Sequence, residues 1–349
     1  MKMLMTCLVI FIFSGVTKGI DLPGKKEPIP SLQPGKYQLE QIKRQYGMFI
    51  HFGINTFQDQ EWTDGTIPPA SYAPTTIDAE QWIRSAQNGG MKYVILISKH
   101  HDGFCLWDSK FTTYDVASSP NKTNVLVAVA KACQKYKMGL GIYYSLWDRN
   151  RNGNTKDSTL DKEYNDYMIN QVSEIIPMVQ KYTPIIEFWF DGGWEKANYR
   201  WPAQRIYETI KAEAPQCQIG INWSIGKPGN PDQHMVLPSD QKDGFPIRYF
   251  PSDFRLGDPY FPSDPDPKIY SHNGKSYYMP WESTICISQR WFYNTKDTTY
   301  KSLEELEKLY KIATAQDNIL ILNCPPNRDG KLRQKDADLL IALKKRLNL

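Results

Sequence analysis

The chain has 349 residues, a length that suits one large α/β barrel with insertions better than two unrelated domains. Its 42 Lys and Arg residues nearly balance its 38 Asp and Glu residues, and the charges are mixed along the chain without basic runs. This pattern argues against proteins that bind nucleic acid or anionic membranes. The chain has ten Trp and 21 Tyr residues, whose rings can stack on sugars, although most of them are expected to fill the core.

The N-terminus has the regions of a secretory signal peptide in their usual order. Lys2 begins a short basic region, an apolar run of about ten residues follows, and small residues lead to Gly19. The run is too short to span a bilayer, and no later run is as long as a membrane helix. We therefore predict an exported bacterial protein, periplasmic or secreted, with a signal peptide at 1–19, an extended leader rich in Pro at 20–36 and one barrel domain at 37–349.

Apolar runs typical of buried strands alternate with helical patterns along the rest of the chain, which is what a parallel sheet covered on both faces requires. The sequence therefore predicts an α/β fold, a (β/α)₈-like barrel; an open doubly wound sheet is the alternative, but no Gly-rich phosphate loop follows the first strand. The stretch 224–278 is rich in Pro, Gly and Asp and is expected to form long loops with one irregular strand near 247–250. The expected strands are centred on Tyr46, Tyr93, Gly141, Ile185, Ile219, Arg248, Trp281 and Ile319, and the expected helices span 78–88, 124–136, 161–181, 203–213, 303–315 and 336–347.

Asp191 is the most unusual of the polar residues that follow the expected strands. In a parallel barrel, reactive side chains lie at the carboxyl ends of the strands. Asp191 comes directly after an apolar run and before the pair Gly192 and Gly193, with Trp189 and Trp194 on either side. A helix N-cap is the alternative, because Asp favours that position, but the next expected helix begins several residues later.

Three histidines also follow expected strands. His51, His100 and His101 could bind a metal together with Asp102, but adjacent residues on a strand point to opposite faces, so only one of the pair is expected to face the barrel mouth. Neutral imidazoles also bind sugar hydroxyls, which suits His51 and one of the pair; the other would be structural, paired with Asp102. The cysteines that remain after the predicted cleavage are odd in number and widely scattered, and no Cys/His spacing suggests zinc.

Two carboxylates that flank a glycosidic bond are the minimal machinery of a retaining glycosidase. Asp191 offers the first. Glu282 could be the second, because its neighbour Trp281 would raise its pKa towards the proton-donating range. Asp253 and Asp258 are competitors for the same role.

These motifs, taken together, resemble those of glycoside hydrolase family 29, the α-L-fucosidases. The resemblance implies a retaining, exo-acting enzyme without metal or organic cofactor, in which Asp191 attacks the anomeric carbon to form a glycosyl-enzyme intermediate. It also implies that His51, His100, His101, Glu61 and Trp62 contact the sugar, that Tyr144 and Trp189 line the pocket, and that Trp291 packs on the C6 methyl group, unless Trp291 is simply a core residue. The similar segments are 46–53, 61–62, 99–109, 188–192, 281–282, 318–326 and 329–330, in the order of the family.

The sequence departs from the family pattern in two places. Members usually carry a C-terminal β-sandwich, whereas this chain ends soon after the last expected strand, so we expect a catalytic domain alone. Where many relatives have Asp-Tyr-x-Thr-Pro-Glu, with a Glu that can serve as acid/base, this chain has Asp253-Phe254-Arg255-Leu256-Gly257-Asp258-Pro259. We therefore rank Glu282 first and Asp258 second as the acid/base.

The function expected from the resemblance is release of terminal α-L-fucose from an oligosaccharide or glycoconjugate, with no nucleic-acid partner and an unspecified oligomeric state. Two alternatives remain open. One is an exo-hydrolase for a related sugar such as an α-L-galactoside, which would need a polar partner for the C6 hydroxyl near Trp291. The other is a catalytically silent glycan-binding barrel, suggested by the altered loop 253–259.

Overall fold

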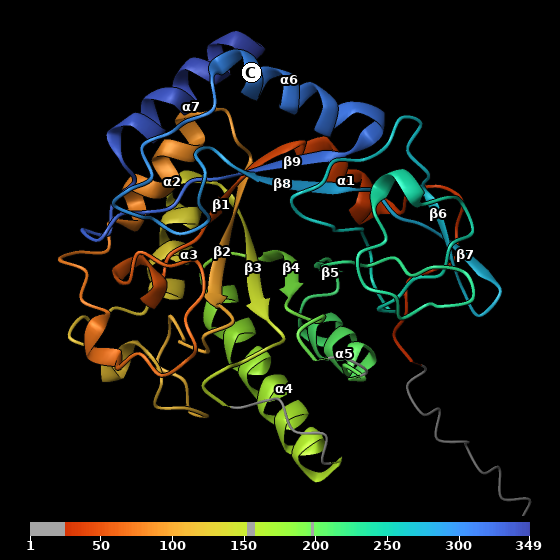
Figure 1. The fold of residues 1–349 in the computed structure, drawn as a ribbon, viewed down its shortest axis with the longest axis horizontal. Coiled ribbons are helices and arrows are strands. Elements are labelled where there is room, and N and C mark those ends of the chain that lie inside the picture. The colour runs from red at the N-terminus through yellow and green to blue at the C-terminus, as the bar shows by residue number, and fades with distance from the viewer. Residues whose placement is uncertain (1–24, 152–157, 197–198) are drawn as a thin grey trace, which may run out of the picture.

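A curled sheet of seven parallel strands forms the centre of the computed structural model, which describes residues 25–151, 158–196 and 199–349 (Figure 1). The predicted signal peptide at 1–19 and the first part of the leader lie outside these residues. The strand order is β5-β4-β3-β2-β1-β9-β8, so consecutive strands are neighbours and no reversal of order occurs as in a doubly wound sheet. The strands are β1 Tyr46–Ile50, β2 Tyr93–Lys99, β3 Gly139–Ser145, β4 Ile185–Asp191, β5 Gln218–Ile221, β8 Glu282–Cys286 and β9 Ile319–Asn323.

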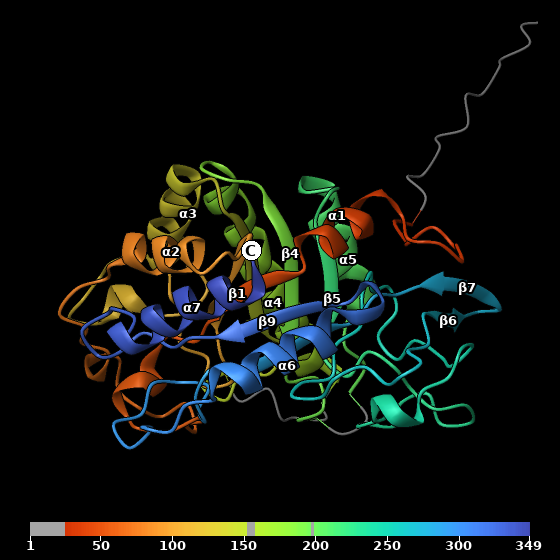
Figure 2. The ribbon, with the colours of Figure 1, turned by 90° about the horizontal axis from the view of Figure 1, so that it is seen from above.

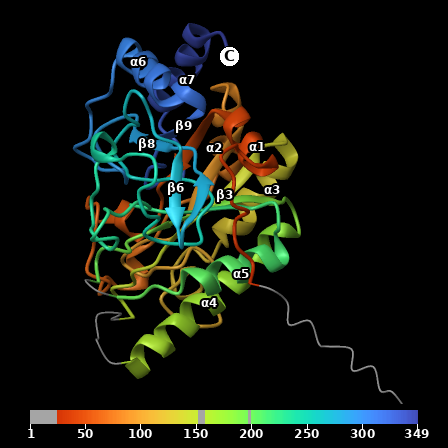
Figure 3. The ribbon, with the colours of Figure 1, turned by 90° about the vertical axis from the view of Figure 1, so that its right-hand side faces the viewer.

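Helices surround the sheet, with α6 and α7 on one side of the molecule and α4 and α5 on the other (Figures 1 and 3). Each predicted helix is confirmed to within a few residues, and Asp78, Asn124 and Ser302 accept hydrogen bonds from backbone N–H groups as N-caps. No helix in the described part of the chain is long and apolar enough to cross a membrane. The helices are α1 Lys36–Arg44, α2 Ala79–Asn88, α3 Val125–Tyr136, α4 Ser158–Gln180, α5 Ala203–Glu213, α6 Leu303–Thr314 and α7 Gln334–Leu347.

Residues 253–256 close the sheet between β5 and β8. The N–H of Asp253 donates to the carbonyl of Ile219 on one side, and the N–H of Glu282 donates to the carbonyl of Arg255 on the other. The expected sixth strand near 247–250 is therefore placed wrongly along the chain. The segment 253–256 was not recognised as a strand because Arg255 interrupts its apolar pattern. The side chain of Arg255 points out of the barrel to Asp266, while Phe254 and Leu256 fill the interior. The predicted barrel class is confirmed, with seven strands in the ladder rather than eight.

The region expected to be loops also contains an antiparallel hairpin, β6 Ile269–His272 and β7 Lys275–Tyr278. The hairpin lies beside α1 at the edge of the barrel (Figures 1 and 2), where Gln38 of α1 donates to the carbonyl of Tyr278. Tyr270 and Tyr277 of the hairpin pack with Ile225 and Ile247 in a small separate core. The sequence did not predict this unit, because its strands are short and only two of their eight residues are buried.

The barrel interior is arranged in levels from the amino ends of the strands to their carboxyl ends. Alternate residues of β4 point inward, so Glu187 lies at the base, Trp189 in the middle and Asp191 at the top. At the base, a Cβ on Gly141 would lie 2.7 Å from the Cγ of Glu187, so this glycine makes room for the inward carboxylate. The middle level is apolar and holds Phe49, Ile95, Tyr143, Trp189, Leu256 and Ile321. On β4, the charged side chains therefore lie at the two ends of the interior.

Candidate active site

Asp191 is the last residue of β4 and lies at the carboxyl end of the barrel with only 7% of its surface exposed. One carboxylate oxygen, Oδ2, accepts a hydrogen bond of 2.8 Å from the hydroxyl of Tyr143, and the other accepts one of 3.0 Å from Nδ2 of Asn222. Burial raises the pKa of Asp191 to about 6, although these two hydrogen bonds oppose the shift. The N-cap alternative is wrong, because the following helix α5 has Pro202 at its N-cap.

Asn222 joins Asp191 to a second carboxyl group, that of Asp258. The amide Nδ2 of Asn222 donates to Oδ1 of both residues, and its Oδ1 accepts from the N–H groups of Trp223 (3.0 Å) and Asp258 (3.4 Å). Because one nitrogen bonds to both carboxyl groups, their nearest oxygen atoms are no more than roughly 6 Å apart. Burial and the charge of Asp191 raise the pKa of Asp258 to about 8. At neutral pH this pair therefore holds one proton, and Asp258 is the better place for it.

Trp223, next to Asn222, has a left-handed backbone conformation with φ 60°, which is unfavourable for a bulky side chain. The hydrogen bond from its N–H to the side chain of Asn222 stabilises that conformation. Strained backbone of this kind is found most often at functional sites. Here it turns the chain sharply at the end of β5 and keeps Asn222 between the two carboxyl groups.

Glu282, the first choice for the acid/base, does not meet Asp191. It is the first residue of β8, pairs with Ile319 at the start of β9, and lies at the base of the barrel. There it accepts a hydrogen bond of 3.1 Å from Tyr93, and burial together with neighbouring Glu187 raises its pKa well above the ordinary value. The expectation failed because it placed Glu282 at the reactive end of its strand, whereas the strand begins there.

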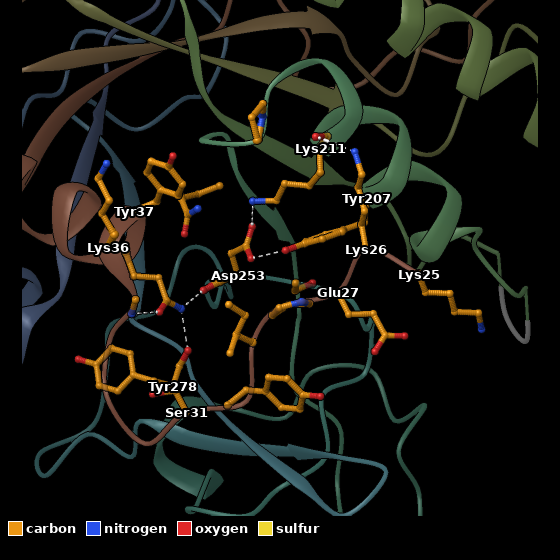
Figure 4. Close-up of a pocket in the computed structure, with 18 residues that line it drawn as sticks. Lys25, Lys26, Glu27, Ser31, Lys36, Tyr37, Tyr207, Lys211, Asp253 and Tyr278 are labelled. Carbon is orange, nitrogen blue, oxygen red and sulfur yellow. Dashed lines mark hydrogen bonds and ion pairs between the residues drawn. The ribbon is translucent and has the colours of Figure 1, made fainter. Parts of the chain in front are cut away.

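Asp253 also lies away from Asp191, beside a cavity of about 650 Å³ between the segment 25–38, α5 and the end of β7 (Figure 4). Its carboxylate forms an ion pair of 2.9 Å with Lys211 and accepts a hydrogen bond of 2.9 Å from Tyr207. The oxygen that meets Lys211, Oδ2, also accepts from the N–H of Ile219. These bonds give Asp253 a structural role in fastening residues 253–256 to β5 and α5.

The three histidines lie together at the mouth of the barrel, with ring centroids 6.0 Å apart for His51 and His100 and 4.2 Å apart for His100 and His101. The expectation that only one of His100 and His101 faces the mouth is wrong. Strand β2 ends at Lys99 after a shift of register, so the alternation of a strand no longer applies to the pair. Burial lowers the pKa of His51 and of His101 to about 3, so both imidazoles are neutral near pH 7.

Hydrogen bonds fix which ring nitrogen carries the proton in two of these histidines. Nδ1 of His51 lies 2.7 Å from Oδ1 of Asn323, which can only accept. Nδ1 of His101 lies 2.7 Å from the hydroxyl of Ser145, whose own proton is donated to the carbonyl of Trp147. Both Nδ1 atoms therefore carry hydrogen, and both Nε2 atoms are left as acceptors. Nε2 of His101 lies 3.6 Å from Oδ2 of Asp191.

Asp102 does not act as a metal ligand in this arrangement. It accepts hydrogen bonds from Asn55 (3.0 Å) and from the N–H of Phe104 (2.7 Å), while Nδ1 of His100 is 3.8 Å away. Among the described residues, no three His, Cys, Asp or Glu side chains are placed as the ligands of one metal ion would be. The histidine cluster is instead a set of buried hydrogen-bonding groups at the carboxyl end of the barrel.

Glu61, Trp62 and Trp291 form the rim of that mouth. The carboxylate of Glu61 accepts from the N–H of Trp291 at 3.0 Å and thus fastens two loops together. The ring of Trp291 packs against His51 with a centroid distance of 5.2 Å, and Trp62, which is 54% exposed, turns its ring towards His101. Trp291 is thus placed beside the histidines rather than in the core.

The expected role of Tyr144 is wrong, because its hydroxyl donates to Gln171 of α4, outside the barrel. Its neighbour Tyr143 faces inward, binds Asp191 and stacks on Trp189 at 5.6 Å. Trp189 is 1% exposed and lies in the level beneath Asp191, so it supports the site from below. Residue alternation could have identified Tyr143, since Gly141, Tyr143 and Ser145 pair with the inward residues of β4. Asn222 and Asn323 were missed as well, although each stands at the carboxyl end of an expected strand.

A family profile described as Alpha-L-fucosidase matches residues 30–348 of the chain. The chain belongs to the alpha-L-fucosidase family. Among curated proteins, it is 31% identical over 321 residues to alpha-L-fucosidase 1 of Arabidopsis thaliana, covering 90% of this chain and 59% of that protein. It is 30% identical over 330 residues to the putative alpha-L-fucosidase 1 of rice, covering 90% of this chain and 57% of that protein. The chain thus spans less than three-fifths of the length of these relatives.

Solved structures of the family have the same barrel. A putative alpha-L-fucosidase from Bacteroides thetaiotaomicron superposes with a TM-score of 0.73 at 26% identity, covering 92% of this chain and 69% of that one. A family 29 fucosidase of Ruminococcus gnavus in complex with fucose superposes with a TM-score of 0.69 at 25% identity, covering 93% and 70% of the two chains. The match to the family profile therefore covers nearly all of the described residues, and these include the carboxyl pair and the histidine cluster.

Proposed function

We propose that this protein is a retaining, exo-acting α-L-fucosidase in which Asp191 is the nucleophile and Asp258 the general acid and base. The observation that carries the proposal is the amide of Asn222, which bonds to both carboxyl groups at once. Retaining glycosidases hold their two carboxyl groups about 5 Å apart, so that one can attack the anomeric carbon while the other reaches the glycosidic oxygen. Membership of the alpha-L-fucosidase family supports fucose as the sugar.

In the first step, a carboxylate oxygen of Asp191 forms a bond to the anomeric carbon as the glycosidic bond breaks. The leaving oxygen takes the proton of Asp258, so the negative charge passes from Asp191 to Asp258. In the second step, the carboxylate of Asp258 removes a proton from water, which attacks the anomeric carbon and releases Asp191. Two inversions give net retention. The higher pKa of Asp258 suits a group that must first donate a proton.

Neutral histidines suit the recognition of the sugar ring. The Nε2 atoms of His51 and His101 are free of the proton and can each accept a hydrogen bond from a sugar hydroxyl. The indole ring of Trp291 lies against His51 and offers an apolar surface next to these acceptors. An apolar surface beside the ring suits the C6 methyl group of fucose better than the C6 hydroxyl of an α-L-galactoside.

The proposal is tested by turnover of aryl α-L-fucosides and α-L-galactosides by the wild type and by Asp191→Ala. We expect fucoside hydrolysis with an α-configured first product, and a loss of at least about 10³-fold in kcat for the variant. Azide should partly restore the variant and form the β-configured fucosyl azide, because a small anion can take the place of the missing nucleophile. Turnover of Asp191→Ala close to that of the wild type, or no turnover of any glycoside by the wild type, would contradict the proposal.

Export of the protein belongs to the same proposal. The basic region, apolar run and small residues of 1–19 support a cleaved secretory signal. N-terminal sequencing of the protein recovered from a bacterial host should find the chain beginning near residue 20, and a mature protein that retains residues 1–19 would contradict export by this route.

A further inference from the structure

An unbroken series of aromatic rings runs around the mouth of the site. Trp62 contacts His101 at a centroid distance of 6.3 Å, and His101 contacts Trp194 at 6.0 Å. Trp194 stacks on His234 at 5.3 Å with an interplanar angle of 14°, and Trp223 contacts both His234 (5.4 Å) and Tyr260 (5.6 Å). We call the part formed by Trp194, His234, Trp223 and Tyr260 the aromatic arc. Sugar contacts expected from the sequence explain Trp62 and His101 but none of the arc.

The arc lies on the Asp258 side of the site. Trp223 follows Asn222, the residue that bonds to Asp258, and Tyr260 is two residues beyond Asp258 in the same turn, closed by a hydrogen bond of 2.9 Å from the N–H of Tyr260 to the carbonyl of Gly257. If Asp258 gives its proton to the glycosidic oxygen, the group attached to that oxygen must lie next to Asp258. The arc therefore borders the space of the leaving group, and its Trp194 end meets the histidine cluster at His101.

His234 adds a directed hydrogen-bond donor to this surface. Its Nδ1 lies 3.2 Å from Nη1 of Arg248, and a guanidinium can only donate, so Nδ1 accepts and the proton of the neutral ring is on Nε2. Burial and the charge of Arg248 lower the pKa of His234 to about 4, which keeps the ring neutral near pH 7. Tyr260 is 37% exposed whereas Trp223 is 6% exposed, so within this pair Tyr260 offers the surface to a ligand.

We infer that the aromatic arc is a binding site for the leaving group, and that this group is a pyranose sugar. Its apolar face packs on the exposed ring of Tyr260, which the buried Trp223 supports, while a hydroxyl accepts from Nε2 of His234. This inference rests on the proposed function. Flat rings combined with a single directed donor are suited to a sugar, which has both an apolar face and hydroxyl groups at its edge. The substrates are then oligosaccharides that end in fucose, and recognition extends to the sugar that carries the fucose.

The experiment compares two kinds of substrate in the full-length protein. One is α-L-fucosyl fluoride, whose leaving group is too small to reach the arc; the other is a set of disaccharides in which α-L-fucose is joined to galactose or N-acetylglucosamine. We expect Tyr260→Ala and His234→Ala each to lower kcat/KM for the best disaccharide by about tenfold more than for the fluoride, the effect of one lost ring contact or hydrogen bond. Phe111→Ala is the matched control, because Phe111 is 38% exposed, close to the 37% of Tyr260, and lies outside the site.

Turnover of the fluoride shows that each variant is folded and that the chemical step works. Equal losses on both kinds of substrate, or a wild type that hydrolyses the fluoride but no disaccharide, would overturn the inference while leaving the proposed function intact. A wild type that hydrolyses neither would overturn the proposed function itself. His234→Gln supplies an N–H donor in place of Nε2, and partial recovery of disaccharide turnover in that variant would support the role of the donor.

Discussion

Asp191 and Asp258 share the amide of Asn222 at the carboxyl ends of the strands, while Glu187 and Glu282 lie beneath α1 at the opposite end of the same barrel. Burial raises the pKa of all four carboxyl groups. The upper pair lies beside the histidines, and Asp258 is partly exposed. The lower pair is closed by α1, whose Arg44 lies 3.5 Å from Glu187. A raised pKa therefore identifies burial, and it does not by itself identify a site that binds substrate.

We expect the largest difference between the two carboxyl pairs when Asp258→Ala is compared with Glu282→Gln. Loss of the general acid should lower kcat on fucosyl disaccharides by about 10³-fold, but much less on α-L-fucosyl fluoride, whose leaving group needs little protonation. Azide should restore Asp258→Ala and form the α-configured fucosyl azide. Glu282→Gln retains the shape of a protonated carboxyl and should keep kcat within about threefold of the wild type.

Asp264→Ala is the control for Asp258→Ala, because Asp264 is exposed on the same long loop. A Glu282→Gln variant that lost far more activity on the disaccharides than on the fluoride would contradict this assignment, because it would place the acid/base at the base of the barrel.

Asn222→Ala should have the next largest effect, a fall of about 10²-fold in kcat/KM, because neither carboxyl group would be held in place. The pH profile should move as well. The wild-type profile is expected to be bell-shaped, with limbs near the pKa of Asp191, about 6, and that of Asp258, about 8. The hydrogen bonds of Asn222 lower both pKa values, so their removal raises both and shifts the whole profile to higher pH. An unshifted profile would mean that Asn222 does not act on the carboxyl pair.

We expect the smallest effect from a substitution of Glu187 at the base of the barrel, which should change the stability of the fold rather than turnover. Burial raises the pKa of Glu187 from 4.5 to about 7, against the opposing charge of Arg44. A carboxyl with a raised folded-state pKa stabilises the fold below its unfolded pKa and loses that contribution as pH rises through the folded value. Between pH 4.5 and 7 this loss is on the order of 3 kcal/mol.

Glu187→Gln has no such charge to bury, so its melting temperature should exceed that of the wild type near pH 8 and approach it near pH 5. Glu163→Gln, at an exposed position of α4, serves as the control. Parallel melting curves for Glu187→Gln and the wild type across this range would contradict the assignment of a charged, buried Glu187.

The sequence predicted the class of fold and the position of Asp191 at the carboxyl end of its strand, because both depend on local pattern. Apolar runs and caps set the strands and helices, and a carboxylate at the end of an apolar strand can reach only the mouth of a barrel. The acid/base could not be assigned in the same way. The order of residues alone does not say at which end of its strand Glu282 lies, and Asp258 reaches the site only because Arg255 turns outward and the segment 253–256 closes the barrel. The alternation of residues along β3 could have predicted that Tyr143 faces inward. The placement of both His100 and His101 at the mouth depends on a register shift in β2, which the sequence pattern does not reveal.

The shared amide of Asn222 also bears on how charge is handled during turnover. In the proposed mechanism, Asp191 loses its negative charge when it becomes an ester, and Asp258 gains one when it gives up its proton. Both carboxyl groups accept from the same Nδ2, so the charge moves from one hydrogen of an NH₂ group to the other, and the total seen by the amide stays constant. Fixed dipoles that need not reorient lower the cost of moving charge in a buried site. In that mechanism, the site keeps one net negative charge throughout the reaction cycle, and neither water nor a mobile side chain has to reorient beside Asn222.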